Sequence, residues 1–137
     1  MTARGIRNNN PLNIRRTKSR WQGMRAEVKD TAFCEFTSLA YGFRAAFVLL
    51  RQYYVKHRLV TIAQIINRWA PPSENATSAY VKRVCGETGI RPDEVLPHPS
   101  KAKEVWCRIV FAMAIVECAK RFDMSIIRQA WEMAQLK

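Results

Sequence analysis

The sequence contains one stretch that is apolar on every face of a helix and carries a single carboxylate. Residues 109–119 read IVFAMAIVECA, and Glu117 is the only charged residue among them. A helix that is hydrophobic all round must be surrounded by protein, so this segment is predicted to lie at the centre of a folded core. A carboxyl group in such a place should keep its proton to a higher pH than usual unless a cation pairs with it.

Two interpretations of Glu117 stay open. A buried carboxylic acid that is still protonated near neutral pH suits general acid chemistry, in which the acid protonates a leaving oxygen. The alternative is structural, because ion pairs also perturb pKa values. Glu117 would then pair with Arg44 or Arg83, or lie at the edge of the buried stripe beside Lys120 and Arg121.

Most of the chain after residue 38 has the spacing of helices. The expected helices are 39–57 after the N-cap Ser38, one opened by the capping box of Thr61 and Gln64 and ended by Pro71 and Pro72, 77–87 before Gly89, 100–122 capped by Ser100, and a last one from Ser125. Residues 90–99 contain three prolines and are expected to form a loop.

The first 38 residues have no long helical period. They are expected to form irregular loops with a small β-hairpin, whose strands are 24–28 and 32–36 and whose turn is 29–31. No internal repeat, low-complexity tract or linker divides the chain. The sequence therefore predicts one α+β domain, mainly helical, over residues 1–137.

The charge is strongly positive, with 23 Lys and Arg against 11 Asp and Glu and a formal net charge of +12. Nucleic acid, an anionic membrane face and the bacterial wall are all partners that such a field attracts. The basic residues occur singly and in pairs, which indicates a folded surface and disfavours a disordered nucleic-acid arm. The net charge alone predicts only nonspecific binding to nucleic acid. Four cysteines and two histidines lack the spacing of metal ligands, so free thiols, no metal and no cofactor are expected.

The chain shows neither the apolar segment of a signal peptide near its start nor a run of about 18 apolar residues that could span a bilayer. It is expected to be made in the cytoplasm.

Three motif blocks follow one another in the first 81 residues: RGIRNNNPLNIR (4–15), a segment with WQG, FCEFTS and YGFRA (21–45), and INRWAPPSENATSAYV (66–81). Together, in this order, they resemble a family of phage and mobile-element lysozyme-like proteins. The same blocks are similar to the peptidoglycan glucosaminidase and lysozyme superfamily, in which a helix with the catalytic Glu precedes them. In this chain residues 114–117, AIVE, resemble the end of that helix. They lie near the C-terminal end of the chain, as they would after a circular permutation.

The resemblance implies a lysozyme-like domain that cleaves peptidoglycan glycan strands, by hydrolysis or by the transglycosylase variant. Glu117 would be the general acid, and Tyr80 would line the cleft and hydrogen-bond substrate or a reacting group. Further residues would shape the sugar site: Asn10, Asn13, Trp21, Glu74 and Asn75. Packing in the core is the alternative for Tyr80, Trp21 and Trp69.

Standard hydrolysis requires a second carboxylate. The resemblance favours Glu27 of the hairpin for this part, ahead of Asp30 and Glu35. Such an enzyme would reach the wall after lysis, on a virion or by non-classical export.

Two departures from the lysozyme-like pattern keep other functions open. Relatives have Gly where this chain has Leu12, and Asn-Gly where it has Cys118 and Ala119, so a non-catalytic phage structural or wall-binding protein is the main alternative. A helical nucleic-acid-binding domain is the third, although a helix-turn-helix over 61–88 would need a short Gly-bearing turn where Pro71 and Pro72 stand. The sequence leaves the oligomeric state and the bond cleaved undetermined.

Overall fold

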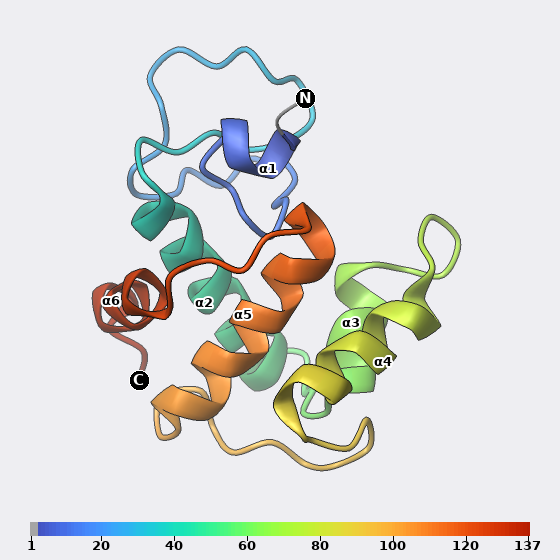
Figure 1. The fold of residues 1–137 in the computed structure, drawn as a ribbon. Coiled ribbons are helices and arrows are strands. Elements are labelled where there is room, and N and C mark those ends of the chain that lie inside the picture. Colours follow the sequence, from blue (N-terminus) through green and yellow to red (C-terminus); the bar gives the residue numbers. More distant parts are fainter. Residues whose placement is uncertain (1–2) are drawn as a thin grey trace.

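The computed structural model describes residues 3–137, which form six helices and no extended sheet, so the protein is mainly helical as predicted (Figure 1). The helices are α1 (Arg4–Arg7), α2 (Leu39–Val55), α3 (Ile62–Trp69), α4 (Thr77–Thr88), α5 (Lys103–Cys118) and α6 (Met124–Ala134). None of them combines the length and apolarity needed to cross a bilayer.

Helix α5 lies in the middle of the molecule, between α4 on one side and α6 on the other (Figure 1). Helices α1 and α2 also pack against it, so partners surround the segment that is apolar on every face. The buried residues of α5 accordingly point in all directions: Trp106, Cys107, Ile109, Val110, Ala112, Met113, Ala114, Ile115 and Cys118. The prediction that this helix forms the centre of the core is confirmed.

The ends of α5 differ from the prediction of 100–122. The helix begins only at Lys103, because the Ser100 hydroxyl pairs with Nδ1 of His98 at 2.8 Å instead of capping a helix. It ends at Cys118, where Ala119 adopts a left-handed conformation with φ of 53°. The chain then turns so that Phe122 packs edge-on against Phe43, with ring centroids 5.4 Å apart.

The other helical boundaries follow local capping chemistry. Ser38 accepts a hydrogen bond from the backbone N–H of Tyr41, and Thr61 accepts one from Gln64, which confirms both predicted N-caps. Helix α6 is capped by Asp123, so its predicted first residue, Ser125, lies inside the helix. All four cysteines are free, as expected.

The predicted hairpin of residues 24–36 is not formed as two strands. The chain does double back, but backbone pairing is limited to two isolated antiparallel bridges, Met24 with Phe36 and Arg15 with Phe33. A side chain binds the backbone of the predicted turn, since the Glu35 carboxylate accepts from the backbone N–H of both Lys29 and Asp30. The sequence also missed the short helix α1, whose four residues are too few to show a period.

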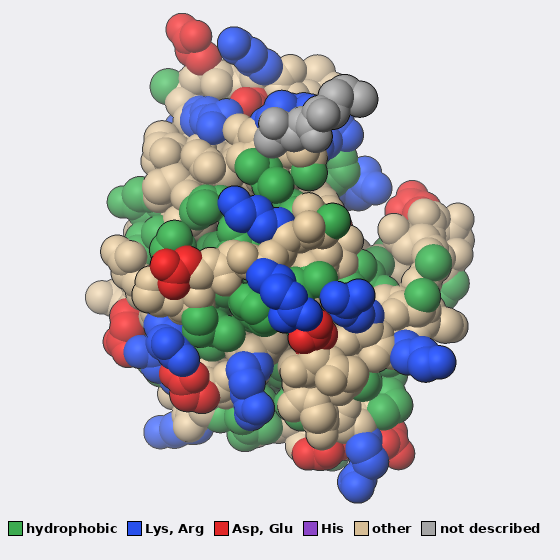
Figure 2. All heavy atoms as spheres, viewed as in Figure 1, with side chains coloured by type: hydrophobic (Ala, Val, Ile, Leu, Met, Phe, Trp, Pro, Cys, Tyr) green, Lys and Arg blue, Asp and Glu red, His purple; other side chains and the backbone are tan. Residues whose placement is uncertain are grey.

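Asn10 organises these N-terminal loops. It is fully buried, its amide nitrogen donates to the carbonyls of Ile14 and Cys34, and its oxygen accepts from the Ile14 backbone N–H. These bonds hold the loop that follows α1 against the 33–36 segment. Figure 2 shows Lys and Arg side chains spread over the face of the molecule that is turned to the viewer.

Candidate functional site

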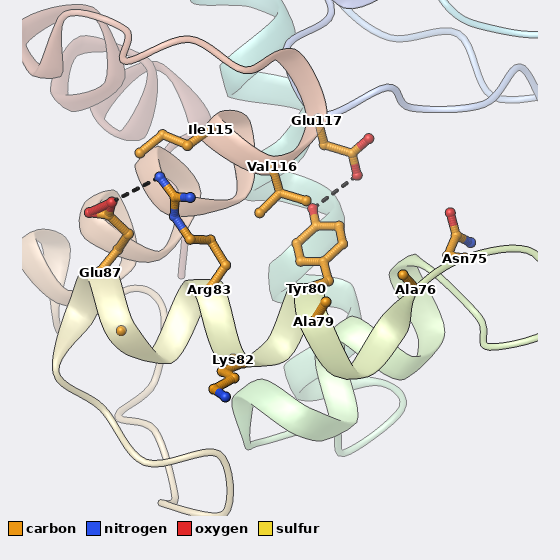
Figure 3. A pocket seen from close by; sticks show the side chains of 11 residues that line it. Asn75, Ala76, Ala79, Tyr80, Lys82, Arg83, Glu87, Ile115, Val116 and Glu117 are labelled. Carbon is orange, nitrogen blue, oxygen red and sulfur yellow. Dashed lines mark hydrogen bonds and ion pairs between the residues drawn. The ribbon is translucent and has the colours of Figure 1, made fainter.

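Glu117 lies in the last turn of α5, half-buried, where two hollows of the surface meet. Its carboxylate has two hydrogen-bond donors from distant parts of the chain. The Asn13 amide donates to Oε1 at 2.8 Å, and the Tyr80 hydroxyl donates to Oε2 at 2.9 Å. Figure 3 shows Tyr80 on α4 pointing directly at Glu117 across the gap between the two helices.

Burial raises the pKa of Glu117 above its ordinary value, while the hydrogen bonds from Asn13 and Tyr80 and the charge of Arg15 act in the opposite direction. The negative end of the α5 dipole adds to the effect of burial. Burial, and then the nearby Glu117, also raises the pKa of Tyr80 well above its usual range. Tyr80 therefore remains a hydrogen-bond donor, and Glu117 keeps its proton to a higher pH than an exposed glutamate.

The ion-pair interpretation of Glu117 is not what the structure shows. Arg83 pairs with Glu87 on its own helix at 3.4 Å, and within residues 3–137 no ion pair joins Glu117 to Arg44 or to any other cation. Its hydrogen-bond partners are an amide and a phenol, both neutral.

The approach of α1 to the end of α5 fixes the position of Asn13. A Cβ atom on Gly5 would lie 2.7 Å from the Cys118 Sγ and 3.0 Å from the Asn13 Oδ1, so only glycine fits at this contact. Asn13 itself adopts a left-handed conformation with φ of 52°, which Asn tolerates better than most residues. This backbone turn aims its amide at Glu117.

The first hollow is a cleft of about 670 Å³ between the N-terminal loops, the end of α2 and the α3–α4 connection. Figure 2 shows the surface notched at its right edge, between the N-terminal part and this connection. Rings, amides and cations contribute to its walls: Trp21, Phe33, Tyr53 and Trp69; Asn13, Gln52 and Asn75; Arg15 and Arg68. The second hollow, of about 880 Å³, lies between α4 and α5.

Six of the eight residues predicted for the site lie together around these hollows. They are Glu117, Tyr80, Asn13, Trp21, Glu74 and Asn75, of which Glu117 and Asn75 line both. Asn10 is buried behind the site, where its polar atoms are bonded to the loops. Glu27 is exposed and lines neither hollow.

The other two carboxylates of the 24–36 segment maintain the loop. Glu35 is buried and binds backbone N–H groups and Arg25, and Asp30 binds Arg4, Asn8 and two backbone N–H groups. Hydrogen bonds to the backbone of Asp30 and Lys29 lower the pKa of Glu35 despite its burial. Both side chains are committed to the loop, away from Glu117.

Sequence reasoning missed Tyr53 and Arg68. The Arg68 guanidinium lies 5.2 Å from the centre of the Tyr53 ring, and that ring packs edge-on against Trp69 at 5.7 Å. Tyr53 follows Leu50 by three residues and so shares the apolar face of its helix, which gave the sequence no signal that its ring also lines the cleft. The Trp69 indole N–H donates to the Leu12 carbonyl, which joins this aromatic wall to the N-terminal loops.

Comparison with known proteins found one informative similarity. The chain is 43% identical over 97 residues to "Protein P5" of Pseudoalteromonas phage PM2. It is similar to a phage protein. The match covers 69% of this chain but 61% of that protein, so the chain spans less than two thirds of the relative's length. No protein-family profile matches the sequence.

Proposed function

We propose that this protein cleaves the glycan strands of bacterial peptidoglycan, with Glu117 as the proton donor. The observation that carries the proposal is the environment of this carboxyl, whose pKa is raised by burial and which opens on an aromatic-lined cleft. A carboxylic acid with a raised pKa beside a sugar-sized cleft is what protonation of a glycosidic oxygen requires.

The cleft suits a carbohydrate from the wall. Ring faces can stack against sugars, while the amides of Asn13, Gln52 and Asn75 can bind hydroxyl and acetamido groups. Arg15 and Arg68 place positive charge along the same walls, and the wall polymer is anionic.

Protonated Glu117 would donate to the glycosidic oxygen while the bond to the anomeric carbon breaks. The carboxylate left behind is already bonded to Tyr80 and Asn13, whose donors stabilise the new negative charge. It can then accept a proton from the nucleophile that attacks the anomeric carbon.

The arrangement of the other carboxylates favours the transglycosylase route. Glu27, Asp30 and Glu35 lie outside the cleft, and Glu74, which lines it, is exposed and faces Arg15 at 3.8 Å. In the transglycosylase route the C6 hydroxyl of the cleaved sugar attacks its own anomeric carbon. Its proton passes to Glu117, which regenerates the acid, and a 1,6-anhydro end forms without consumption of water.

The lysozyme-like resemblance supports the same proposal. Asn13 comes from the first motif block, Trp21 from the second, and Asn75 and Tyr80 from the third, and all four surround the late Glu117. A permuted lysozyme-like domain requires that residues of these three blocks lie around the late catalytic glutamate. The similarity to a phage protein fits a phage-related chain that reaches the wall by lysis or on a virion.

Digestion of purified peptidoglycan followed by mass spectrometry of the soluble fragments tests the proposal. We expect fragments whose ends are one water lighter than reducing ends. If the fragments carry reducing ends instead, and these disappear when Glu74 is replaced, the reaction is hydrolysis and not the transglycosylase route. Binding to the wall without release of any fragment would overturn catalysis in favour of a wall-binding protein.

A further inference from the structure

The hollow between α4 and α5 continues from Glu117 on the side opposite the aromatic cleft, and the cleavage mechanism does not use it. With about 880 Å³ it is larger than the aromatic cleft. Figure 3 shows Glu117 and Tyr80 at one end of it and Arg83 and Glu87 at the other. Whatever binds here would extend from the reacting bond along α4.

The far end of this hollow has an excess of positive charge. Glu87 is the carboxylate there, and it is shared by Arg83 at 3.4 Å and Arg121 at 2.6 Å. Hydrogen bonding from Arg121 lowers the pKa of Glu87, so the carboxylate is ionised and already neutralised. Arg83 is half-exposed, and Lys82 next to it also lines the hollow. A second carboxylate, supplied by a ligand, could bind Arg83 without displacing the Arg121 pair.

The middle of the hollow is lined by apolar side chains. Helix α5 contributes Ile115 and Val116 there, while the small residues on the α4 side lie at the ends, Ala79 beside Tyr80 and Gly86 beside Glu87. A Cβ on Gly86 would meet nothing within 4 Å, so this stretch is open to a ligand backbone. The shape fits an extended chain with small apolar side chains.

We propose that this hollow, defined by residues 76–87 of α4 and its N-cap and by α5 residues 115–117, binds the stem peptide of the peptidoglycan strand that Glu117 cleaves. The proposal rests on the proposed function, because glycan cleavage at Glu117 is what places the muramic acid ring at this end of the hollow. A stem peptide leaves the muramic acid ring beside the reacting bond, carries small alanine side chains and ends in free carboxylates. Those features match the end at Glu117, the apolar middle and the cationic end in that order.

Binding of two ligands to the Glu117→Gln variant tests this without any need for cleavage. One ligand is the muramic acid–glucosamine disaccharide with its stem peptide, and the other is the same disaccharide without the peptide. Titration calorimetry should show tighter binding of the peptide-bearing ligand. Adding Arg83→Ala should lower the affinity for the peptide-bearing ligand about 10-fold, as expected for the loss of one charged hydrogen bond. The affinity for the peptide-free ligand should stay within about 2-fold.

Lys101→Ala is the matched control, because it removes one exposed positive charge on the loop before α5. Lys101→Ala should leave the affinities for both ligands unchanged. If net charge alone set the affinity, Lys101→Ala would lower it as much as Arg83→Ala does. Arg83→Ala should fold normally, since Glu87 keeps its shorter pair with Arg121.

The proposal is overturned if the two ligands bind equally well, if the peptide-bearing one does not bind, or if Arg83→Ala weakens only binding of mixed-sequence DNA. Preference for the peptide-bearing ligand together with an absence of glycan cleavage by the wild type would refute the enzymatic function and keep the peptide site. Cleavage without such a preference would refute the peptide site alone.

Discussion

The Tyr80 hydroxyl donates to Oε2 of Glu117 at 2.9 Å and so joins the middle of α4 to the last turn of α5. The two residues are 37 positions apart, and Glu117 lines both the aromatic cleft and the hollow between the helices. Because the phenol is buried and retains its proton, it stabilises the carboxylate form of Glu117 more than the acid form.

Tyr80→Phe should slow glycan cleavage about 10-fold near neutral pH, because the carboxylate formed by proton transfer loses one donor. The same loss raises the pKa of Glu117 further, so the alkaline limb of the pH–rate profile should move to higher pH. Tyr54→Phe is the control, since that hydroxyl donates to the Leu96 carbonyl outside the cleft. An unchanged profile in Tyr80→Phe would contradict the assigned contact.

Glu117 should make stability depend on pH in the direction opposite to most carboxylates. Its folded-state pKa is raised by burial, so between the unfolded and folded values the native state binds more protons, and stability falls as pH rises. Glu117→Gln removes this dependence. Its melting temperature should therefore equal or exceed that of the wild type above neutral pH. An unfolded variant at that pH would instead indicate that the carboxylate is needed structurally, as the acceptor of the Asn13 and Tyr80 hydrogen bonds.

Glu35 should make the stability of the protein depend on pH in the direction usual for a carboxylate. Its folded-state pKa is lowered by hydrogen bonds from the backbone of Asp30 and Lys29, so its stabilisation is present above the unfolded value and is lost as pH falls. Glu35→Gln should lower the free energy of unfolding by about 2 kcal/mol at pH 7 and by much less in acid. Urea unfolding at both pH values, with exposed Glu27→Gln as a control expected to change little, decides this.

Gly5 and Gly86 give a matched pair for packing at the site. Gly5→Ala should destabilise the protein by about 1 to 3 kcal/mol and slow cleavage, because the new methyl group collides with Cys118 and displaces Asn13. Gly86→Ala meets no atom within 4 Å and should raise stability by up to about 1 kcal/mol through helix propensity. Equal effects of the two changes on the melting temperature would refute the close contact at Gly5.

The sequence predicted the helical part of the fold well, because apolar spacing and caps such as Ser38 and Thr61 are local signals. It predicted the N-terminal loops poorly, because side chains there bind backbone groups without any periodic pattern that would signal the contact. Glu35 binds the backbone N–H groups of Lys29 and Asp30, six and five positions away. Asn10 joins two loops, since its amide donates to the carbonyl of Cys34, 24 positions away.

The candidate site was predicted in part for the same reason. The isolation of Glu117 in an apolar helix is visible in the sequence, but its bond with Asn13 spans 104 positions and depends on where α1 packs. Glu27 was favoured as a second carboxylate on the assumption of a regular hairpin. Since the segment is held by Asp30 and Glu35 instead, Glu27 points to solvent.

The release of soluble fragments from purified peptidoglycan by wild type and Glu117→Gln at equal concentration tests the central claim most directly. The variant retains the size of the side chain but cannot supply an acidic proton, so release should be about 10²- to 10⁴-fold slower while circular dichroism shows the same helical content. Release by the folded Glu117→Gln variant at the wild-type rate would show that Glu117 is not the acid.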